Sequence, residues 1–86
     1  MKEDTKIKKT MKCLFAHSLK MLRMDHRDRI EDLAKKSGVA SSTISKYEQG
    51  TADMSIDKLE QIIAPYNISL YIFFLNTLAK TQEDVN

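Results

Sequence analysis

Several residue types are scarce in this chain of 86 residues, and each scarcity excludes a class of protein. A single cysteine excludes a disulfide framework, and one cysteine with two histidines gives no metal-ligand spacing. Two glycines and one proline argue against a hairpin-rich β fold. The apolar run 70–75 is far too short to span a membrane, and no secretory signal follows the N-terminus. We therefore expect one small, cytoplasmic domain without metal, cofactor or membrane contact.

Charge is unevenly distributed along the chain, although the net charge is only +2. Residues 1–50 carry 12 Lys and Arg against 7 Asp and Glu, whereas residues 51–86 carry 2 against 5. A basic half of this kind is expected where one face meets phosphates, but chance segregation on a solvated surface fits equally well. The N-terminal segment is rich in lysine and has two possible roles, an arm that lies along the DNA and binds phosphates or a solvated leader. Its lysines are Lys2, Lys6, Lys8, Lys9 and Lys12.

Two short helical patterns flank Gly38, one over residues 30–36 and one over residues 42–49. Two helices joined by a short turn that contains glycine make a helix-turn-helix. Ala34 would be small because the second helix crosses close to it, and Gly38 would adopt a positive φ at the turn. Ile44 would fill the crossing from the second helix. These three residues predict the central motif of an all-α fold.

Apolar spacing and capping residues predict the remaining helices. The first runs from Ile7 to about residue 24, and Asp28 caps the second, with Glu31 completing a capping box. Ser55 caps a fourth helix that ends at a proline, and Ser69 caps a fifth over residues 70–80. Residues 68–75 are also rich in strand-forming side chains, so a strand stays open there, although helix is preferred. We expect a flexible basic leader (1–6), one domain (7–80) and a disordered tail (81–86).

The segments in this order resemble the Cro and phage-repressor type of helix-turn-helix protein, also called Xre-like. The resemblance covers residues 12–74 and rests on five stretches of sequence, namely SLKMLR, DLA, SGV, STISKYEQG, and SIDKL followed by NISL. A match to the alanine, glycine and isoleucine alone would be weak. The resemblance implies a compact bundle of about five short helices around the helix-turn-helix.

In such proteins the recognition helix, here residues 41–49, lies in the major groove of DNA. The resemblance implies base contacts from Ser41, Ser42 and Lys46, although Ser41 could instead be a helix cap and Lys46 a solvated lysine. The resemblance implies DNA backbone contacts from Thr43 and from Arg23, which it also pairs with Glu48. Ser45 either faces the DNA or bonds back to its own helix. Arg27 and Arg29 are the local phosphate candidates that would replace a family backbone contact missing at position 30. The resemblance also implies structural roles for Ala34, Gly38, Ile44 and Glu48.

Three positions depart from the family pattern. Ile30 stands where a glutamine that contacts the DNA backbone is common, so it supplies an apolar side chain instead. Ala40 replaces the usual serine cap of the recognition helix. Asp53 lies in a loop that is often basic.

The expected function is that of a sequence-specific transcriptional regulator, a repressor that binds an inverted-repeat operator as a homodimer. The dimer surface is expected in the C-terminal helix, which has too many apolar residues for one buried face: Leu70, Tyr71, Phe73, Phe74 and Leu78. The alternative is a protein-interaction module such as an antitoxin that binds a toxin and has weak or no DNA binding. An enzyme is not expected, because no nucleophile–base constellation or phosphate loop is present.

Overall fold

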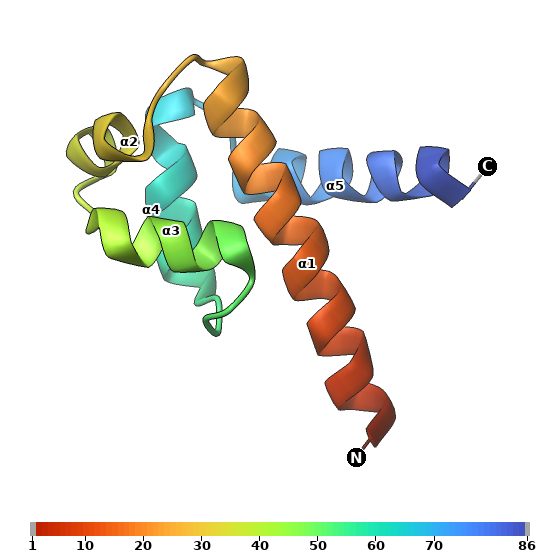
Figure 1. Ribbon diagram of the computed structural model, residues 1–86. Helices are drawn as coiled ribbons and strands as arrows, with labels where there is room; N and C mark the ends of the chain where they lie inside the picture. The colour runs from red at the N-terminus through yellow and green to blue at the C-terminus, as the bar shows by residue number, and fades with distance from the viewer. Residues whose placement is uncertain (1, 86) are drawn as a thin grey trace.

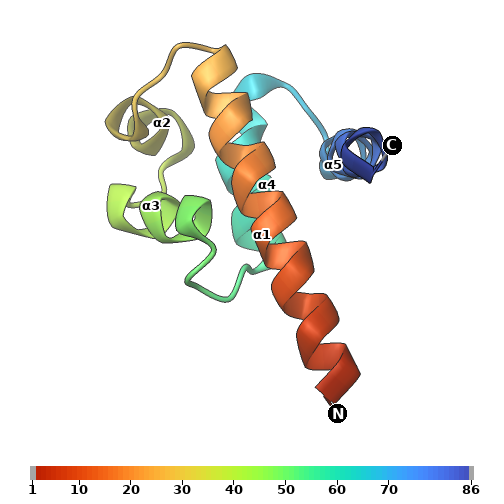
Figure 2. The same cartoon turned by 45° about the vertical axis from the view of Figure 1, so that its right-hand side comes forward.

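The computed structural model describes the backbone of residues 2–85 and the side chains of residues 12–79, and all regular elements in that range are helical. The elements are α1 (Lys2–Asp25), α2 (Ile30–Ser37), α3 (Ser41–Gln49), α4 (Ile56–Ile63), the 3₁₀ turn η1 (Ala64–Tyr66) and α5 (Leu70–Val85). In Figure 1, α2, α3 and α4 gather beside the C-terminal half of α1, whereas α5 points away from them. Figure 2 places α3 and α5 on opposite sides of α1. The predicted all-α bundle with a central helix-turn-helix is confirmed.

The two outer helices are longer than the sequence patterns predicted. Helix α1 begins at Lys2 and not near Ile7, so most of the leader expected to be flexible is helical. Helix α5 continues to Val85, so the expected disordered tail is helical up to that residue. Met1 and Asn86 lie outside the described residues. Both predictions relied on low apolar content at the ends, which does not prevent helix formation by residues with good helix propensity.

The core forms where the first four helices meet α5. Its members are apolar side chains that are almost fully buried: Leu19, Leu33, Val39, Ile44, Tyr47, Leu59, Ile62, Ile63 and Phe73. Ile44 is fully buried at the crossing of the two motif helices, as predicted, and Ala34 packs at the edge of the same cluster. Complete burial of one such side chain contributes about 1.5–3 kcal/mol. This cluster therefore holds α3 against the rest of the molecule.

Glycine residues end both helices of the motif. Gly38 follows α2 with φ 75°, and its N–H donates to the Ala34 carbonyl oxygen at 2.9 Å. Gly50 follows α3 with φ 70°. A residue with a Cβ is strained in this left-handed conformation, so glycine is favoured at both positions. The predicted role of Gly38 is confirmed.

The predicted cap of α2 was wrong by one residue. The helix begins at Ile30, and the Asp32 carboxylate accepts the Arg29 backbone N–H at 2.9 Å, so Asp32 replaces Glu31 in the reciprocal contact. Asp28 does not cap the helix, because its carboxylate binds two side chains from elsewhere in the fold.

The predicted caps of the last two helices are present. The Ser55 hydroxyl accepts the Lys58 N–H at 3.2 Å, and the Ser69 hydroxyl accepts the Ile72 N–H at 3.2 Å. The segment left open between helix and strand is thus the first half of α5.

Helix α5 packs against α1 by its inner face. Phe74 stacks on Phe15 with ring centroids 4.8 Å apart, and the Thr77 and Ser18 hydroxyls form a hydrogen bond of 2.8 Å. Phe73 was expected at a dimer surface, but it is 2% exposed and belongs to the core of its own chain. Leu70 and Phe74 are likewise half-buried against that core. Helical spacing alone could not tell which arc of α5 faces α1.

Among the described residues, no single helix has the length and apolar composition to cross a membrane. The helical segments Ile56–Tyr66 and Leu70–Ala79 have sufficient length and apolar composition only when taken together, and this pair is bent by 91°.

Candidate nucleic-acid interface

Helix α3 turns one face to the core and the other to solvent. Ile44 and Tyr47 lie on the inner face, where the Tyr47 hydroxyl accepts the Ser55 backbone N–H at 3.1 Å. The expected base-contact residues Ser41, Ser42 and Lys46 are all exposed. The burial of the inner face therefore leaves short hydroxyls and one long cation on the outer face.

Gln49 belongs to the same outer face and was missed from the sequence. Ser45 and Lys46 lie three and four residues after Ser42, and Gln49 lies four and three residues after them, which places the four side chains in one row along the helix. The Gln49 amide nitrogen donates to the Ser45 hydroxyl at 3.2 Å. The spacing of seven residues from Ser42 was the signal available in the sequence. We refer to these four residues as the α3 row.

The N-terminus of α3 has no side-chain cap. Ala40 occupies the cap position, where its methyl side chain cannot accept a hydrogen bond, and Ser41 is the first helical residue. The alternative role of Ser41 as a cap is therefore wrong. Backbone N–H groups in the first turn of a helix lack helical partners and carry partial positive charge, which favours an anion nearby. Thr43 is half-buried at this end of the helix.

Arg23 and Glu48 form the predicted pair between α1 and α3. The Arg23 Nε atom lies 2.7 Å from Glu48 Oε2, and the Nη2 atom lies 3.0 Å from Oε1. The Arg23 side chain is 12% exposed and the Glu48 side chain 5%. The hydrogen bond from Glu48 raises the pKa of Arg23 above its ordinary value. The third guanidinium nitrogen donates to the Asp28 carbonyl oxygen at 2.7 Å, so all three nitrogens bind inside the protein.

The two exposed arginines that were expected to contact the DNA backbone, Arg27 and Arg29, lie just before α2. Arg27 is exposed and adopts φ 57°, and Arg29 is exposed with its side chain 3.4 Å from Asp32. The Asp32 hydrogen bond raises the pKa of Arg29. Ile30 is half-buried and packs against the core, as the departure from the family pattern implied.

The basic N-terminal stretch is described only in part. The side chains of Lys2, Lys6, Lys8 and Lys9 lie outside the described residues. Lys12 forms an ion pair with Asp53, which holds the acidic loop after α3 against α1.

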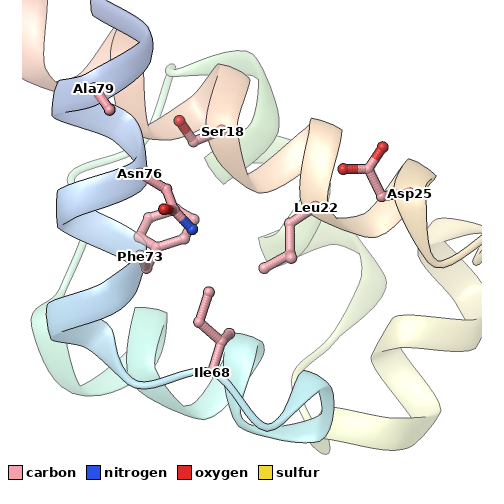
Figure 3. A pocket seen from close by; sticks show the side chains of 7 residues that line it. All are labelled: Ser18, Leu22, Asp25, Ile68, Phe73, Asn76 and Ala79. Carbon is pink, nitrogen blue, oxygen red and sulfur yellow. The ribbon is translucent and has the colours of Figure 1, made fainter.

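Two pockets flank α1. The smaller has a volume of about 200 Å³ beside the α3 row and is lined by Lys20, Arg23, Ile30, Ser45, Glu48 and Gln49. The larger, of about 380 Å³, lies between α1 and α5, where Leu22, Ile68 and Phe73 point into it and Asp25 and Asn76 lie at its edge (Figure 3). Within the described part of the chain, no three His, Cys, Asp or Glu side chains gather as a metal site would require.

The sequence pattern of the helix-turn-helix family matches residues 19–73. The chain belongs to the helix-turn-helix family. The helix-turn-helix is of the Cro and C1 type, as the resemblance to the Cro and phage-repressor proteins implied.

Solved structures of a restriction-modification controller protein, C.Esp1396I, share the fold of this helix-turn-helix protein. The wild-type structure is 25% identical with a TM-score of 0.76, and the match covers 84% of this chain and 94% of that one. The tetramer of that protein in complex with its natural operator is 26% identical with a TM-score of 0.74, covering 79% and 90%. A search of the curated proteins found no match.

Proposed function

We propose that this helix-turn-helix protein is a sequence-specific DNA-binding transcriptional regulator that reads its operator with α3. The observation that carries the proposal is the α3 row, a line of exposed or half-exposed polar and basic side chains on a helix whose opposite face is buried in the core. The family supports the same function, and C.Esp1396I was solved as a tetramer on its operator. A helix held in this way can enter the major groove without losing its packing.

Base contacts fall to Ser41, Ser42 and Lys46, to which we add Gln49. Lys46 suits the O6 and N7 acceptors of guanine, and an amide such as that of Gln49 suits the N6 and N7 atoms of adenine. Serine hydroxyls both donate and accept, so they fit several bases. These four base-contact residues therefore combine two discriminating side chains with two adaptable ones.

Backbone contacts fall to Thr43, Ser45, Arg27 and Arg29, each of which is at least partly exposed. Such contacts set the position of a protein on DNA and depend on salt. We assign Arg23 a different role from the one first expected, because its guanidinium is occupied by Glu48 and the Asp28 carbonyl. It orients α3 and leaves phosphate binding to the exposed arginines.

The protein acts as a homodimer in this proposal, with α5 at the interface. The apolar side chains that α5 leaves in solvent form one arc: Tyr71, Ile72, Leu75 and Leu78. Tyr71 and Leu78 are retained from the expected dimer surface, Ile72 and Leu75 are added to it, and the buried Phe73 is removed from it. A two-fold dimer matches an inverted repeat and represses by occupying it. The same arc would also accept another protein, and this is the feature that favours the antitoxin-like alternative.

Selection of bound sequences from a random DNA pool tests the proposal. The wild-type protein should enrich a pseudo-palindromic motif. Lys46→Ala should relax the preference at one base pair in each half-site by about 1–3 kcal/mol, the value of one bidentate contact. Lys58→Ala is the matched control, because Lys58 is exposed on α4, and it should keep the wild-type motif. Failure of the wild-type protein to enrich any motif would reject DNA reading and favour the protein-interaction module.

A further inference from the structure

A cluster of polar side chains joins five segments of the fold around Asp28. We call it the Asp28 cluster, and its members come from α1, the turn before α2, α2 itself, α3 and η1: Arg23, Asp28, Lys36, Glu48 and Tyr66. Its only link to α3 among the described contacts is the Arg23–Glu48 pair. The cluster lies beneath the DNA-reading surface, and none of its members belongs to the α3 row.

The contacts of the cluster form a continuous chain from η1 to α3. The Tyr66 hydroxyl donates to Asp28 Oδ2 at 2.8 Å, and the Asp28 carbonyl oxygen accepts from Arg23 Nη1 at 2.7 Å. Arg23 then binds both oxygens of Glu48. Lys36 approaches both Asp28 oxygens, at 2.9 and 2.8 Å, and so holds the carboxylate from the far end of α2.

The contacts of the cluster maintain the protonation states of Tyr66 and Asp28 and restrain the Tyr66 ring. Burial and the hydrogen bond to Asp28 raise the pKa of Tyr66, so its hydroxyl keeps its proton and remains a donor. The Lys36 ammonium and the Tyr66 hydroxyl lower the pKa of Asp28, so the carboxylate stays charged. The His26 ring stacks on the Tyr66 ring at 4.2 Å and limits its movement.

Stability alone does not account for such a cluster. Removing charges from water costs free energy that ion pairing often fails to recover, and apolar side chains of similar volume would stabilise the site as well or better. Directional hydrogen bonds instead define one arrangement of the segments that they join. The segments joined here are the reading helix and the turn that leads into α5, since Tyr66 lies four residues before Leu70.

We propose that Tyr66 and Asp28 are positioning residues that couple the turn before α5 to the orientation of α3 through Arg23 and Glu48. This inference rests on the proposed function, because orientation matters only if α3 reads DNA. Tyr66 then controls specific DNA affinity without contacting DNA. Movement of the turn, for example when α5 meets a second copy of the chain, changes the geometry of the reading helix.

The test replaces Tyr66 by phenylalanine, which removes only the hydroxyl. Thr77→Val is the matched control, because it also removes a buried hydroxyl with two hydrogen bonds, from α5 to Ser18 and to the Phe73 carbonyl. In the DNA-free protein, NMR should show faster exchange of the Arg23 Nε–H in Tyr66→Phe and shifted amide signals in α3. Thr77→Val should leave both at their wild-type values. This measurement tests the coupling even if the protein binds no DNA.

The second measurement compares dissociation constants for the selected operator and for random DNA at one salt concentration and at a temperature where the variants are folded. Tyr66→Phe should weaken operator binding about tenfold, the effect of about 1.4 kcal/mol, and leave random-DNA binding within twofold. Thr77→Val should keep the wild-type ratio. In a Glu48→Gln background, Tyr66→Phe should have a smaller further effect, because glutamine leaves Arg23 only one neutral acceptor and so weakens the link from Arg23 to α3.

The results that overturn the coupling are distinct from those that overturn the proposed function. An unchanged Arg23 signal and an unchanged operator ratio in folded Tyr66→Phe would reject the coupling and leave DNA reading intact. If Tyr66→Phe does not fold, Asp28→Asn takes its place, since asparagine removes the charge that Lys36 and Tyr66 bind and keeps the side-chain volume. Additive effects of Asp28→Asn and Glu48→Gln would then reject the coupling.

Discussion

Replacing Glu48 by alanine leaves the Arg23 guanidinium without its carboxylate inside the protein. The Arg23 side chain is 12% exposed and Glu48 only 5%, so little water can replace the lost partner. Removal of one member of a buried pair costs about 3–5 kcal/mol. Arg23 keeps its hydrogen bond to the Asp28 carbonyl, which favours the lower end of that range. We therefore expect Glu48→Ala to lower the free energy of unfolding by about 3 kcal/mol.

Thermal and urea unfolding followed by circular dichroism measure this loss. In a domain of this size, each kcal/mol lowers Tm by about 4–8 °C, so the expected decrease is about 12–24 °C. Glu31→Ala is the matched control, because Glu31 is an exposed glutamate in the first turn of α2. Substitutions at such surface positions change stability by about 0.5 kcal/mol or less.

Glu48→Gln separates charge from shape in the same experiment. Glutamine keeps the volume and one neutral acceptor for Arg23, so its Tm should lie between those of the wild type and of Glu48→Ala. Equal melting temperatures for Glu48→Ala and Glu31→Ala would refute the argument, because the pair would then contribute no more than a solvated side chain.

Two further outcomes follow from the charges and the exposed apolar arc. The pKa of Asp28 is lowered in the fold, so its charge stabilises the protein above the ordinary value of 3.8, and this contribution is lost as the pH falls through the lower folded value. Tm should therefore decrease below about pH 4, less steeply in Asp28→Asn than in the wild type; parallel curves would contradict this. Leu75→Ser should weaken self-association in sedimentation velocity without lowering Tm at dilute concentration, because Leu75 is 43% exposed. Phe73→Ala should instead destabilise the fold by about 3–5 kcal/mol. An unchanged dimer dissociation constant in Leu75→Ser would remove the α5 arc from the interface.

Local patterns were sufficient for the motif at the centre of the chain. Ala34, Gly38 and Ile44 act within a few residues of one another, through a helix crossing and a turn whose geometry depends on residue type. The caps Ser55 and Ser69 are local in the same sense, since each bonds an N–H three residues ahead. The ends of α1 and α5 could not be predicted, because apolar spacing marks where a helix is buried and not where it stops.

The cap of α2 and the face of α5 show where local patterns fail. Asp28 has the right residue type for a cap, but Lys36 and Tyr66 come from other segments and bind its carboxylate first. Phe73 and Leu75 are both apolar and two residues apart, yet only Phe73 faces the core.

By itself, the sequence determined the helix-turn-helix and the polar character of α3, because each depends on residue type at a fixed helical spacing. The pairing of Arg23 with Glu48 was implied by the family resemblance, since the two residues lie on different helices. Tertiary structure decided which apolar residues of α5 remain in solvent and which charges meet around Asp28. Those outcomes depend on how separate helices pack against one another. Contacts between residues far apart in the sequence, such as Tyr66 with Asp28 at a separation of 38 positions, leave no periodic trace in it.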